Sequence, residues 1–484
     1  MKTPVREAPT DRTWSPGNPT GETRPEDRVP VSEKIALGAG SLPLFYGNAG
    51  VKTLVVPAYQ MLRGLNPALL GLVLALPHCW DAVTDPLVGM ISDNCRTRFG
   101  RRRPIIALGA ILQAVTFGTI WIAPSSFGPR ATLAYLAGTL ILFYTCFSVF
   151  AVPLTSLTYE MTPDYRERTR VTAFGGFFSK VAELTYGWMF WIANLAIFGT
   201  VANGLKYVGW GIAGVIMGLV GLVPALFVRE RYAGVARRQE AVRFGPAVRA
   251  VIANRAFAVI AGLLICQVIG GMLASNLDYY LLVYPMSGGN VAEGTKWKAI
   301  LTSGYAIIGM LSIYPVNWLA NRAGKRAALA MIFLLVLAGA AGKWLFFTPG
   351  HPWKILLDPL LCAPIYPALI ILIPSMIADA CDDDELRHGL RREGMVAAFF
   401  SWIQKAGYAA SFFGSGLALY LTGFDAALGG AQPARAILAM RVILAGATAV
   451  WAVVALGLLR FYPLNRQRAG EIRAQLEARR GRVR

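Results

Sequence analysis

Two carboxylates stand four residues apart in a segment that is otherwise apolar. The stretch "WDAVTDPLVGMISDN" from Trp80 places Asp81 and Asp85 at positions i and i+4, and on a helix these positions share one face. An acid near the centre of a bilayer costs about 2.5–3.5 kcal/mol, so such a group usually faces a cavity and marks an ion or proton path. Two neighbouring carboxylates repel each other when both are ionised, and a shared cation or proton relieves that repulsion. The pair therefore predicts a coupling site for Na⁺ or H⁺.

Two other side chains fit the same chemistry. Thr84 adds a hydroxyl ligand on the adjoining face, and Lys405 lies well inside the apolar stretch "FFSWIQKAGYAASFFGSG". A lysine there can neutralise the acids when the cation is absent, which would make lysine and cation competitors for one site. The alternatives are that the acids cap or pack a helix and that Lys405 extends its ammonium to a membrane interface.

Composition indicates the kind of element that must carry these groups. Of the 484 residues, 55% are hydrophobic and 15% are charged, well below the roughly 25% charged residues of soluble domains. Apolar runs of about 20 residues recur, and each can cross a hydrocarbon core near 30 Å thick. We predict an all-α membrane protein. The net charge of +20 lies in short segments between apolar runs, which argues against a nucleic-acid partner.

Twelve apolar spans are predicted, with basic and base-poor loops alternating between them. The spans fall at about 35–60, 67–92, 104–124, 132–160, 172–199, 205–228, 255–285, 297–320, 326–346, 355–380, 394–422 and 435–461. The basic loops follow the even-numbered spans, so the positive-inside rule places both termini in the cytoplasm. We expect a bacterial inner-membrane protein.

Two stretches of the chain are echoed roughly 220–230 residues later, as in transporters built from two halves in parallel orientation. "DPLVGMISDNCRTRFGRR" from Asp85 is echoed by "YPVNWLANRAGKR" from Tyr314, and "MTPDYRERTR" by "ADACDDDELRHGLRREG". We predict two pseudo-symmetric six-helix bundles at 34–228 and 255–461. They would be joined by a cytosolic loop at 229–254, with a disordered tail at 1–33 and a basic tail at 462–484.

The charged residues at the predicted cytoplasmic ends of the spans indicate a second function, that of a gate. Ion pairs there can hold neighbouring helices in one state of alternating access and break as the bundles move; the alternative is that these bases only set topology. The predicted gate residues are Asp93, Arg101, Arg102, Asp164, Arg166, Arg168, Asp384 and Arg391.

With these residues assembled, the chain resembles the glycoside–pentoside–hexuronide:cation symporters of the major facilitator superfamily, typified by melibiose permease. The resemblance rests on "WDAVTDPLVGMISD" with "GRRRP", on "VPLTSLTYEMTPDYRERTR", on "MIADACDDDELRHGLRREG" and on the lysine in "IQK". It implies that Asp81, Asp85 and Ser148 belong to the cation site and that Lys405 is its charge partner. It also implies cation-coupled symport of a sugar, glycoside or hexuronide by alternating access, a coupling ion in place of a cofactor, and a monomer surrounded by lipid.

The family's sugar-binding acids have no counterpart here, because the first span holds no acid and the matching positions later are Ala151 and Gly176. Polar and aromatic residues within the apolar spans are the candidates for a substrate site instead. They are Asn48, Lys52, Lys180, Glu183, Gln267, Asn276, Asp278 and Tyr305. Lys180 and Glu183, three residues apart, are alternatively an internal ion pair.

Two other functions remain open at this point. One is a carrier of lysolipids or other amphiphiles, which would need an apolar groove open to the membrane. The other is an intramembrane prenyltransferase in which "DAVTD" and "DACDDDE" hold Mg²⁺ through carboxylates. Against the enzyme, the second acidic cluster lies in a basic loop, and no GxSxG, HExxH or P-loop motif is present.

Overall fold

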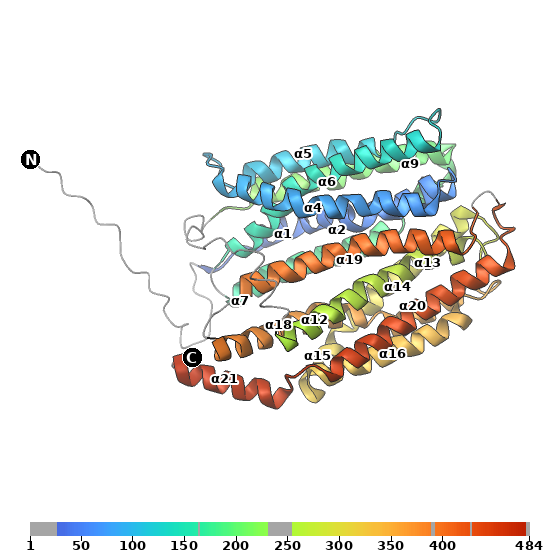
Figure 1. Cartoon of the computed structure of the whole chain (residues 1–484). Coiled ribbons are helices and arrows are strands. Elements are labelled where there is room, and N and C mark those ends of the chain that lie inside the picture. The colour runs from blue at the N-terminus through green and yellow to red at the C-terminus, as the bar shows by residue number, and fades with distance from the viewer. Residues whose placement is uncertain (1–26, 163–164, 231–253, 389–392, 426–427, 481–484) are drawn as a thin grey trace, which may run out of the picture.

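The computed structural model describes residues 27–162, 165–230, 254–388, 393–425 and 428–480. Helices make up the regular structure of this part of the chain, and the extended pairing found there is an isolated bridge between Thr97 and Gly100. The predicted all-α class is confirmed. The helices run roughly side by side, and α21 lies at the end where α1 begins (Figure 1). We call this end the terminal end and the other the opposite end.

Within the described residues, the first half of the chain forms six helical segments. The first, 31–61, is broken into α1 (Val31–Ala39), α2 (Ser41–Phe45), η2 (Tyr46–Gly50), α3 (Val51–Val55) and η3 (Val56–Met61). The others are α4 (Pro67–Asn94), α5 (Arg103–Thr119), α6 (Pro129–Glu160), α7 (Tyr165–Tyr186) with α8 (Met189–Ala193), and α9 (Val201–Ile212) continued by η5 (Ala213–Val220) and α10 (Gly221–Phe227). A short turn, η4 (Ala196–Phe198), precedes α9.

The described part of the second half forms six more segments, followed by a further helix. They are α12 (Arg255–Cys266) with η7 (Gln267–Gly271) and α13 (Met272–Val283), α14 (Val291–Leu311) with α15 (Ile313–Ala323), α16 (Lys325–Phe346), η8 (Pro352–Leu356) with α17 (Leu357–Cys362) and α18 (Ile365–His388), α19 (Glu393–Leu421), and α20 (Ala434–Arg460). Helix α21 (Arg466–Arg480) follows α20, packs against α18, and buries Ile472 and Leu476.

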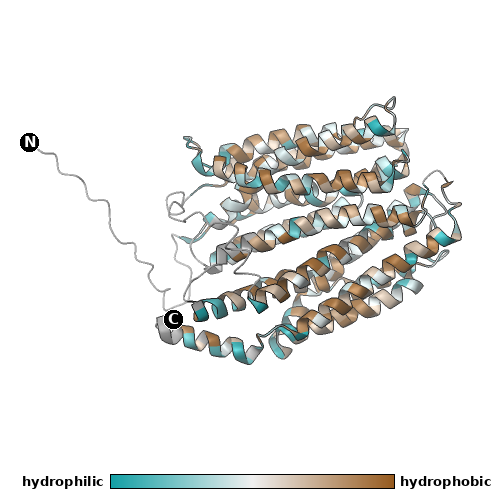
Figure 2. Cartoon of the chain, in the orientation of Figure 1, coloured by the Kyte–Doolittle hydropathy of each residue, from teal (hydrophilic) through white to brown (hydrophobic). Residues whose placement is uncertain are grey.

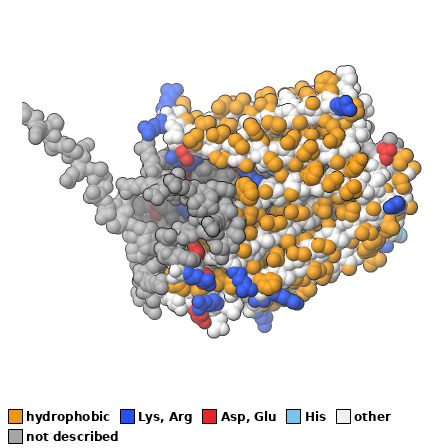
Figure 3. All heavy atoms as spheres, in the orientation of Figure 1, with side chains coloured by type: hydrophobic (Ala, Val, Ile, Leu, Met, Phe, Trp, Pro, Cys, Tyr) orange, Lys and Arg blue, Asp and Glu red, His pale blue; other side chains and the backbone are white. Residues whose placement is uncertain are grey.

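Each of the twelve predicted spans overlaps one of these segments. By length and composition, seven helices of the described chain could cross a membrane, or eight if the pair α14 and α15, bent by 43°, is one span. The other segments are shorter, interrupted or more polar. Helix α5 has only 17 residues, and α7 begins with the charged sequence "YRERTR". Hydrophobic residues run along the helices and hydrophilic ones gather near their ends (Figure 2), and the face shown in Figure 3 is largely apolar between basic ends.

The predicted N-terminal tail and the predicted loop between the bundles can be compared with the structure in part. Helix α1 begins at Val31, inside the predicted tail 1–33, and the Val29 N–H donates to Glu167 at 3.0 Å. Lys34 lies 2.6 Å from the same carboxylate, so the start of α1 is fixed to α7. Residues 1–26 of the predicted tail and 231–253 of the predicted loop lie outside the described residues.

The two halves meet along α4 with α19 and α7 with α14. Near the opposite end, α4 and α19 touch through two glycines. A Cβ atom on Gly71 would lie 2.6 Å from the Phe412 carbonyl oxygen, and one on Gly416 would lie 2.3 Å from the Pro67 carbonyl oxygen. Tyr280 also donates a hydrogen bond to Gln60 across the halves. The halves are therefore in close backbone contact toward the opposite end.

Candidate cation site and central cavity

The predicted acid pair lies on α4, beside α6 and α19. Lys405 on α19 donates to Oδ2 of Asp85, and Ser148 on α6 donates to Oδ1 of the same carboxylate at 2.7 Å. The Thr84 hydroxyl lies 3.5 Å from that of Ser148. Four of the residues expected together, Thr84, Asp85, Ser148 and Lys405, thus form one connected cluster. Its acid and hydroxyls come from one half and its ammonium from the other.

Asp81 lies one turn before Asp85 on α4 and makes fewer hydrogen bonds. The residue is 8% exposed, and its Oδ1 is buried without a hydrogen-bond partner among the described residues. Its Oδ2 lies 3.9 Å from Nδ1 of His78. A buried acceptor without a partner costs free energy, and carboxylate and hydroxyl oxygens are ligands that hard cations prefer. Asp81 and the cluster around Asp85 therefore bring together oxygens of the kind that a small cation or a proton binds.

His78 is a residue of this site that the sequence reasoning missed. Its ring stacks on Phe412 of α19 with an interplanar angle of 2° and a centroid distance of 5.3 Å, and Tyr144 meets its edge at 5.6 Å. His78 therefore stands between the acid Asp81 and a ring of the other half. The signal in the sequence was its spacing, because positions i and i+3 share a helix face.

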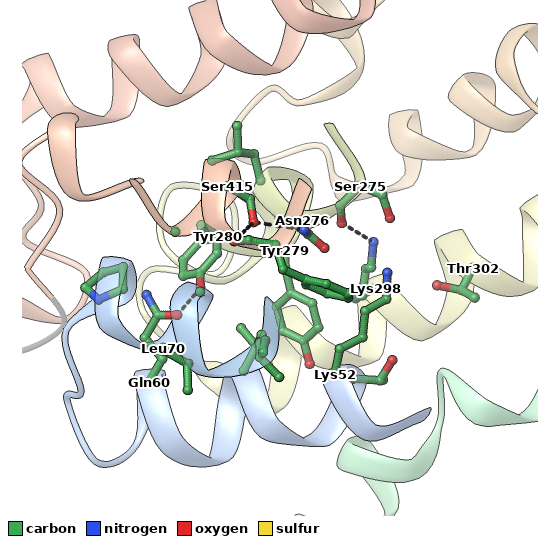
Figure 4. A pocket seen from close by; sticks show the side chains of 18 of the residues that line it. Lys52, Gln60, Leu70, Ser275, Asn276, Tyr279, Tyr280, Lys298, Thr302 and Ser415 are labelled. Carbon is green, nitrogen blue, oxygen red and sulfur yellow. Dashed lines mark hydrogen bonds between the residues drawn. The ribbon is translucent and has the colours of Figure 1, made fainter. Parts of the chain in front are cut away.

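A cavity of about 660 Å³ lies between the halves and reaches Asp81, His78 and Lys405. Seven of the eight predicted substrate residues line it: Asn48, Lys52, Lys180, Glu183, Gln267, Asp278 and Tyr305. The eighth, Asn276, lines a smaller pocket nearer the opposite end, where it donates to Ser415 at 2.9 Å (Figure 4). Lys52 and Lys298 line both spaces. The cavity is within the range of about 300–1,000 Å³ typical of small-molecule sites.

Most charges around the cavity occur as ion pairs. Lys180 and Glu183 are 2.6 Å apart on α7, which is the internal pair that the sequence left open as an alternative. In the second half, Lys298 lies 2.5 Å from Asp278 and Lys343 lies 2.7 Å from Asp358. These pairs cancel charge locally, so most lysines of the wall are not isolated cations awaiting an anion.

Lys298, Lys343 and Asp358 were missed as site residues. Asp358 also accepts a hydrogen bond from the Tyr305 hydroxyl at 2.5 Å, so it ties α14, α16 and α17 together. Each of the three charges falls inside a predicted apolar span or at its edge, and such charges are rare in membrane helices unless they are functional or paired. That rarity was the available signal.

At the terminal end, the predicted gate residues belong to a cluster that ties α4, α5 and α6 together. Arg102 is 4% exposed and donates to Glu160 and to Asp93, at 2.6 Å and 2.9 Å from its Nη2. Arg101 donates to Glu160 at 2.9 Å. The Glu230 carboxylate accepts backbone N–H groups from residues 101–103 at 2.7–2.9 Å. Glu160 is the central acid of this cluster, and the sequence prediction did not include it.

The second half carries a smaller version of this cluster. Lys325 lies 2.5 Å from Asp379 on α18, in the stretch that echoes the first. Both loops turn at a glycine in the left-handed region, Gly100 with φ +110° and Gly324 with φ +87°, a conformation that L residues with side chains rarely adopt. Among the described residues, the ion pairs of the first cluster join residues of the first half, and the pair of Lys325 with Asp379 joins residues of the second half. Neither set of ion pairs crosses between the halves.

The remaining gate residues are placed as follows. Arg168 donates to the Thr162 carbonyl at 3.2 Å, and Asp384 is 5% exposed on α18. Asp164, Arg391 and the side chain of Arg166 lie outside the described residues. A role for all eight residues as a gate remains a prediction.

The pKa of Glu160 should make the terminal cluster sensitive to pH. Burial raises this pKa, but hydrogen bonds and charge from Arg102 and Arg101 outweigh burial and hold it below its ordinary value. A lowered pKa means that the stabilisation is present above the unfolded-state pKa and is lost as pH falls through the folded-state pKa. The stability of the first half should therefore decline in acid as Glu160 becomes protonated.

We expect Glu160→Gln to lower the free energy of unfolding by about 3 kcal/mol at neutral pH, because removing one partner of a buried ion pair leaves the other uncompensated. Asp93→Asn removes a carboxylate whose side chain is 57% exposed, and exposed pairs contribute at most about 1 kcal/mol. Thermal unfolding of both variants between pH 4 and 8 would test this. Equal losses in the two variants would contradict the central role of Glu160.

The comparisons with known proteins agree with this geometry. Residues 36–466 match the family model described as MFS/sugar transport protein. An uncharacterized symporter of Synechocystis is 27% identical over 94% of this chain and 98% of its own length. The isoprimeverose transporter of Lactiplantibacillus pentosus is 24% identical over 88% of each chain. The sodium-dependent lysophosphatidylcholine symporter 1 of Gallus gallus is 22% identical over 93% of this chain and 90% of its own.

A solved structure shows the same fold. It is a bacterial homologue of the human lysosomal transporter Spinster in an inward-facing, unoccupied conformation, with a TM-score of 0.63 at 16% identity over 90% of this chain and 98% of that one. The family match covers most of the chain, and the sodium-dependent symporter among these relatives aligns with 93% of it. The chain therefore belongs to the MFS/sugar transport protein family, among the glycoside–pentoside–hexuronide:cation symporters of the major facilitator superfamily, and is a membrane transporter, not an enzyme.

Proposed function

We propose that this protein couples the movement of Na⁺ or H⁺ to uptake of a sugar or glycoside, and that Asp81, Asp85, Thr84 and Ser148 bind the cation. The observation that carries the proposal is the hydrogen bond between Lys405 of one half and Asp85 of the other. The Lys405 ammonium, which is attached to the chain, thus occupies the carboxylate that a free cation would bind. Loading the site requires the ammonium to give way, and that change alters a contact between the halves.

The coupling follows from which contacts cross between the halves. With Lys405 on Asp85 and Phe412 on His78, α4 and α19 are joined from the acid pair to the glycine contact. A cation on Asp81 and Asp85 removes the electrostatic attraction for Lys405 and so weakens this joint. Substrate in the cavity then biases which arrangement of the halves is stable, since a ligand shifts a conformational equilibrium by its differential affinity.

Support for a sugar-type substrate comes from the wall of the cavity. Besides its ion pairs, the wall carries the amides of Asn48 and Gln267 and the aromatic rings of Tyr186 and Tyr305. Planar hydrogen-bonding groups with an aromatic platform suit a sugar, which has both hydroxyls and apolar ring faces. The isoprimeverose transporter among the relatives agrees with this reading.

The second candidate is a carrier of lysolipids. It is favoured by the lysophosphatidylcholine symporter among the relatives and by Ile370, which lines the cavity and is 69% exposed. A sugar substrate remains the better-supported proposal because the family model itself is one of sugar transport.

We further propose that the protein works as a monomer in the bacterial inner membrane, with lipid around it and both termini in the cytoplasm. The arrangement of bases supports this orientation, since the basic loop between α4 and α5 and the basic helix α21 lie at the same end of the molecule, and bases gather on the cytoplasmic side of a membrane.

A thermal-shift screen of the purified protein would test the proposed function. Sugars, glycosides, uronides and lysophosphatidylcholine would each be added with Na⁺ or with choline, at pH 6 and pH 8. We expect a sugar or glycoside to raise the melting temperature, and to do so more with one coupling ion, because a ligand that binds the folded state stabilises it by mass action. Stabilisation by lysophosphatidylcholine alone would favour the second candidate.

A further inference from the structure

Three arginines come together on the surface of the second half, at the terminal end. Arg255 begins α12, Arg326 lies in the first turn of α16, and Arg460 ends α20. All three are exposed, and basic side chains gather at this end of the second half in Figure 3. Nη2 of Arg326 donates to the Arg460 carbonyl at 3.4 Å, and Cζ of Arg255 lies 5.7 Å from the ring centroid of Phe461. The three bases therefore lie around the end of α20.

The stretches of chain that contain these arginines provide no acid to neutralise them. Residues 241–277, 294–357 and 426–470 include no Asp or Glu. Among the described residues, no ion pair involves Arg255, Arg326 or Arg460, and Asp379 of α18 is already held by Lys325 at 2.5 Å. Like charges repel one another. An anion from outside the described chain would therefore stabilise this arrangement.

The first half has an acid of its own at the corresponding contact. Arg103, in the first turn of α5, donates to two carbonyls near the end of α10 at 2.7 Å and 3.0 Å, as Arg326 does at the end of α20. The Glu230 carboxylate lies at the same place and accepts the backbone N–H of Arg103 at 2.9 Å. The first half thus supplies an anion from its own chain, whereas the described residues of the second half supply none.

Apolar surface continues from the arginines along the side of the second half. Gly457 lies one turn before the end of α20, and a Cβ atom on it would meet nothing within 4 Å, so this side of the helix is open. Val450 and Val453 share a face with Gly457 and are 62% and 53% exposed. On α16, Met331 and Leu334 are 50% and 54% exposed. A ligand at the arginines would therefore have apolar surface beside it.

We propose that Arg255, Arg326 and Arg460 bind the headgroup phosphate of an anionic phospholipid, whose acyl chains lie along α16 and α20. The arginine fork matches the geometry of phosphate oxygens, and basic sites between membrane helices bind lipid headgroups. A free phosphate ion would use the same donors but would gain nothing from the apolar surface, which selects the lipid. Under the proposed orientation, the lipid belongs to the cytoplasmic leaflet. All three arginines belong to the second half, so the site is separate from the proposed cation site.

The test measures lipid binding by the purified full chain in dodecyl maltoside. Dioleoylphosphatidylglycerol would be titrated in, and bound lipid would be counted by native mass spectrometry. Dioleoylphosphatidylcholine, which has the same acyl chains and no net charge, is the comparison. We expect phosphatidylglycerol to bind at least about tenfold more tightly, because one base near an anionic headgroup contributes a factor of about five and three bases act together here.

Variants of the three arginines locate the binding. Arg326→Gln and Arg460→Gln should each weaken phosphatidylglycerol binding about fivefold. The triple variant with Arg255→Gln should bind the two lipids equally. Arg435→Gln removes the same charge from an exposed residue at the other end of α20 and should bind as wild type does. Melting temperatures without added lipid would confirm that each variant is folded.

A glycine variant tests the place of the acyl chains without changing any charge. Gly457→Leu fills the open side of α20 beside the arginines and should also weaken phosphatidylglycerol binding. Gly138→Leu, on α6 of the first half, is its control, because a Cβ atom there also meets nothing within 4 Å. Sodium phosphate at the concentration of the lipid should not displace it.

Four results would overturn the lipid site. They are equal affinity of the wild type for the two lipids, undiminished phosphatidylglycerol binding in the folded triple variant, wild-type binding by Gly457→Leu, and displacement of the lipid by inorganic phosphate. The last would show a site for small anions in place of a lipid site. None of these results bears on the proposed symport, which the thermal-shift screen tests separately.

Discussion

Asp85→Asn is expected to reduce gradient-driven uptake of the substrate to background, while substrate binding and exchange persist. Asp85 is the acid that Lys405 and Ser148 both contact. The amide keeps the shape and can still accept from Ser148, but it carries no charge to attract Na⁺ or to take up a proton at neutral pH. Without that charge, the cation gradient cannot drive uptake, whereas the residues proposed to bind the sugar are unchanged.

The measurement is uptake into cells or proteoliposomes under an imposed Na⁺ or pH gradient, beside exchange at equal concentrations. Glu471→Gln, the same change of charge at an exposed residue of α21, is the control and should transport normally. Full concentrative uptake by Asp85→Asn would remove Asp85 from the coupling site. Loss of exchange together with uptake would point to a folding defect, which thermal unfolding of the same preparation would reveal.

Gly416→Val is expected to abolish transport for a steric reason. A Cβ atom at residue 416 would lie 2.3 Å from the Pro67 carbonyl oxygen, which is backbone and cannot rotate away. The halves then cannot approach at the opposite end, so the closed arrangement seen here becomes inaccessible and the transport cycle stops. Gly414→Val is the matched control on the same helix, because a Cβ atom there meets nothing within 4 Å.

The conformational part of this prediction can be measured without substrate. Thr53 lines the small pocket near the opposite end and is 8% exposed. In a Thr53→Cys background, Gly416→Val should raise the rate of labelling by a membrane-impermeant maleimide, whereas Gly414→Val should leave it unchanged. Equal labelling rates and normal uptake in both variants would show that this glycine contact does not govern closure.

The acid pair and its lysine could be found from the sequence because charges are rare in apolar spans. Asp81, Asp85 and Lys405 stand out against their neighbours, and helical periodicity places the two acids on one face. What the pattern could not supply is distance between helices. It did not indicate that Lys405 contacts Asp85 and not Asp81, or that Phe412 stacks on His78.

The substrate wall was predicted less well, for a related reason. Lys298 and Lys343 were not recognised as residues of this wall, and each meets an acid 15–20 residues away in the chain. Such pairing depends on how neighbouring helices turn toward each other, which local sequence does not specify. The fold itself was more predictable, since span length and loop charge depend on the bilayer and not on side-chain packing.

The tethered Lys405 ammonium has a consequence for how much cation the transporter needs. A group attached to the same chain competes at an effective concentration set by geometry, commonly in the millimolar range for flexible tethers, and washing cannot dilute it. Under the proposed coupling, the lysine raises the apparent dissociation constant of the cation above its intrinsic value. The increase is larger when the lysine occupies Asp85 in a larger fraction of the molecules. The protein thus carries its own internal competitor, and the length of that side chain sets the cation concentration at which the carrier begins to work.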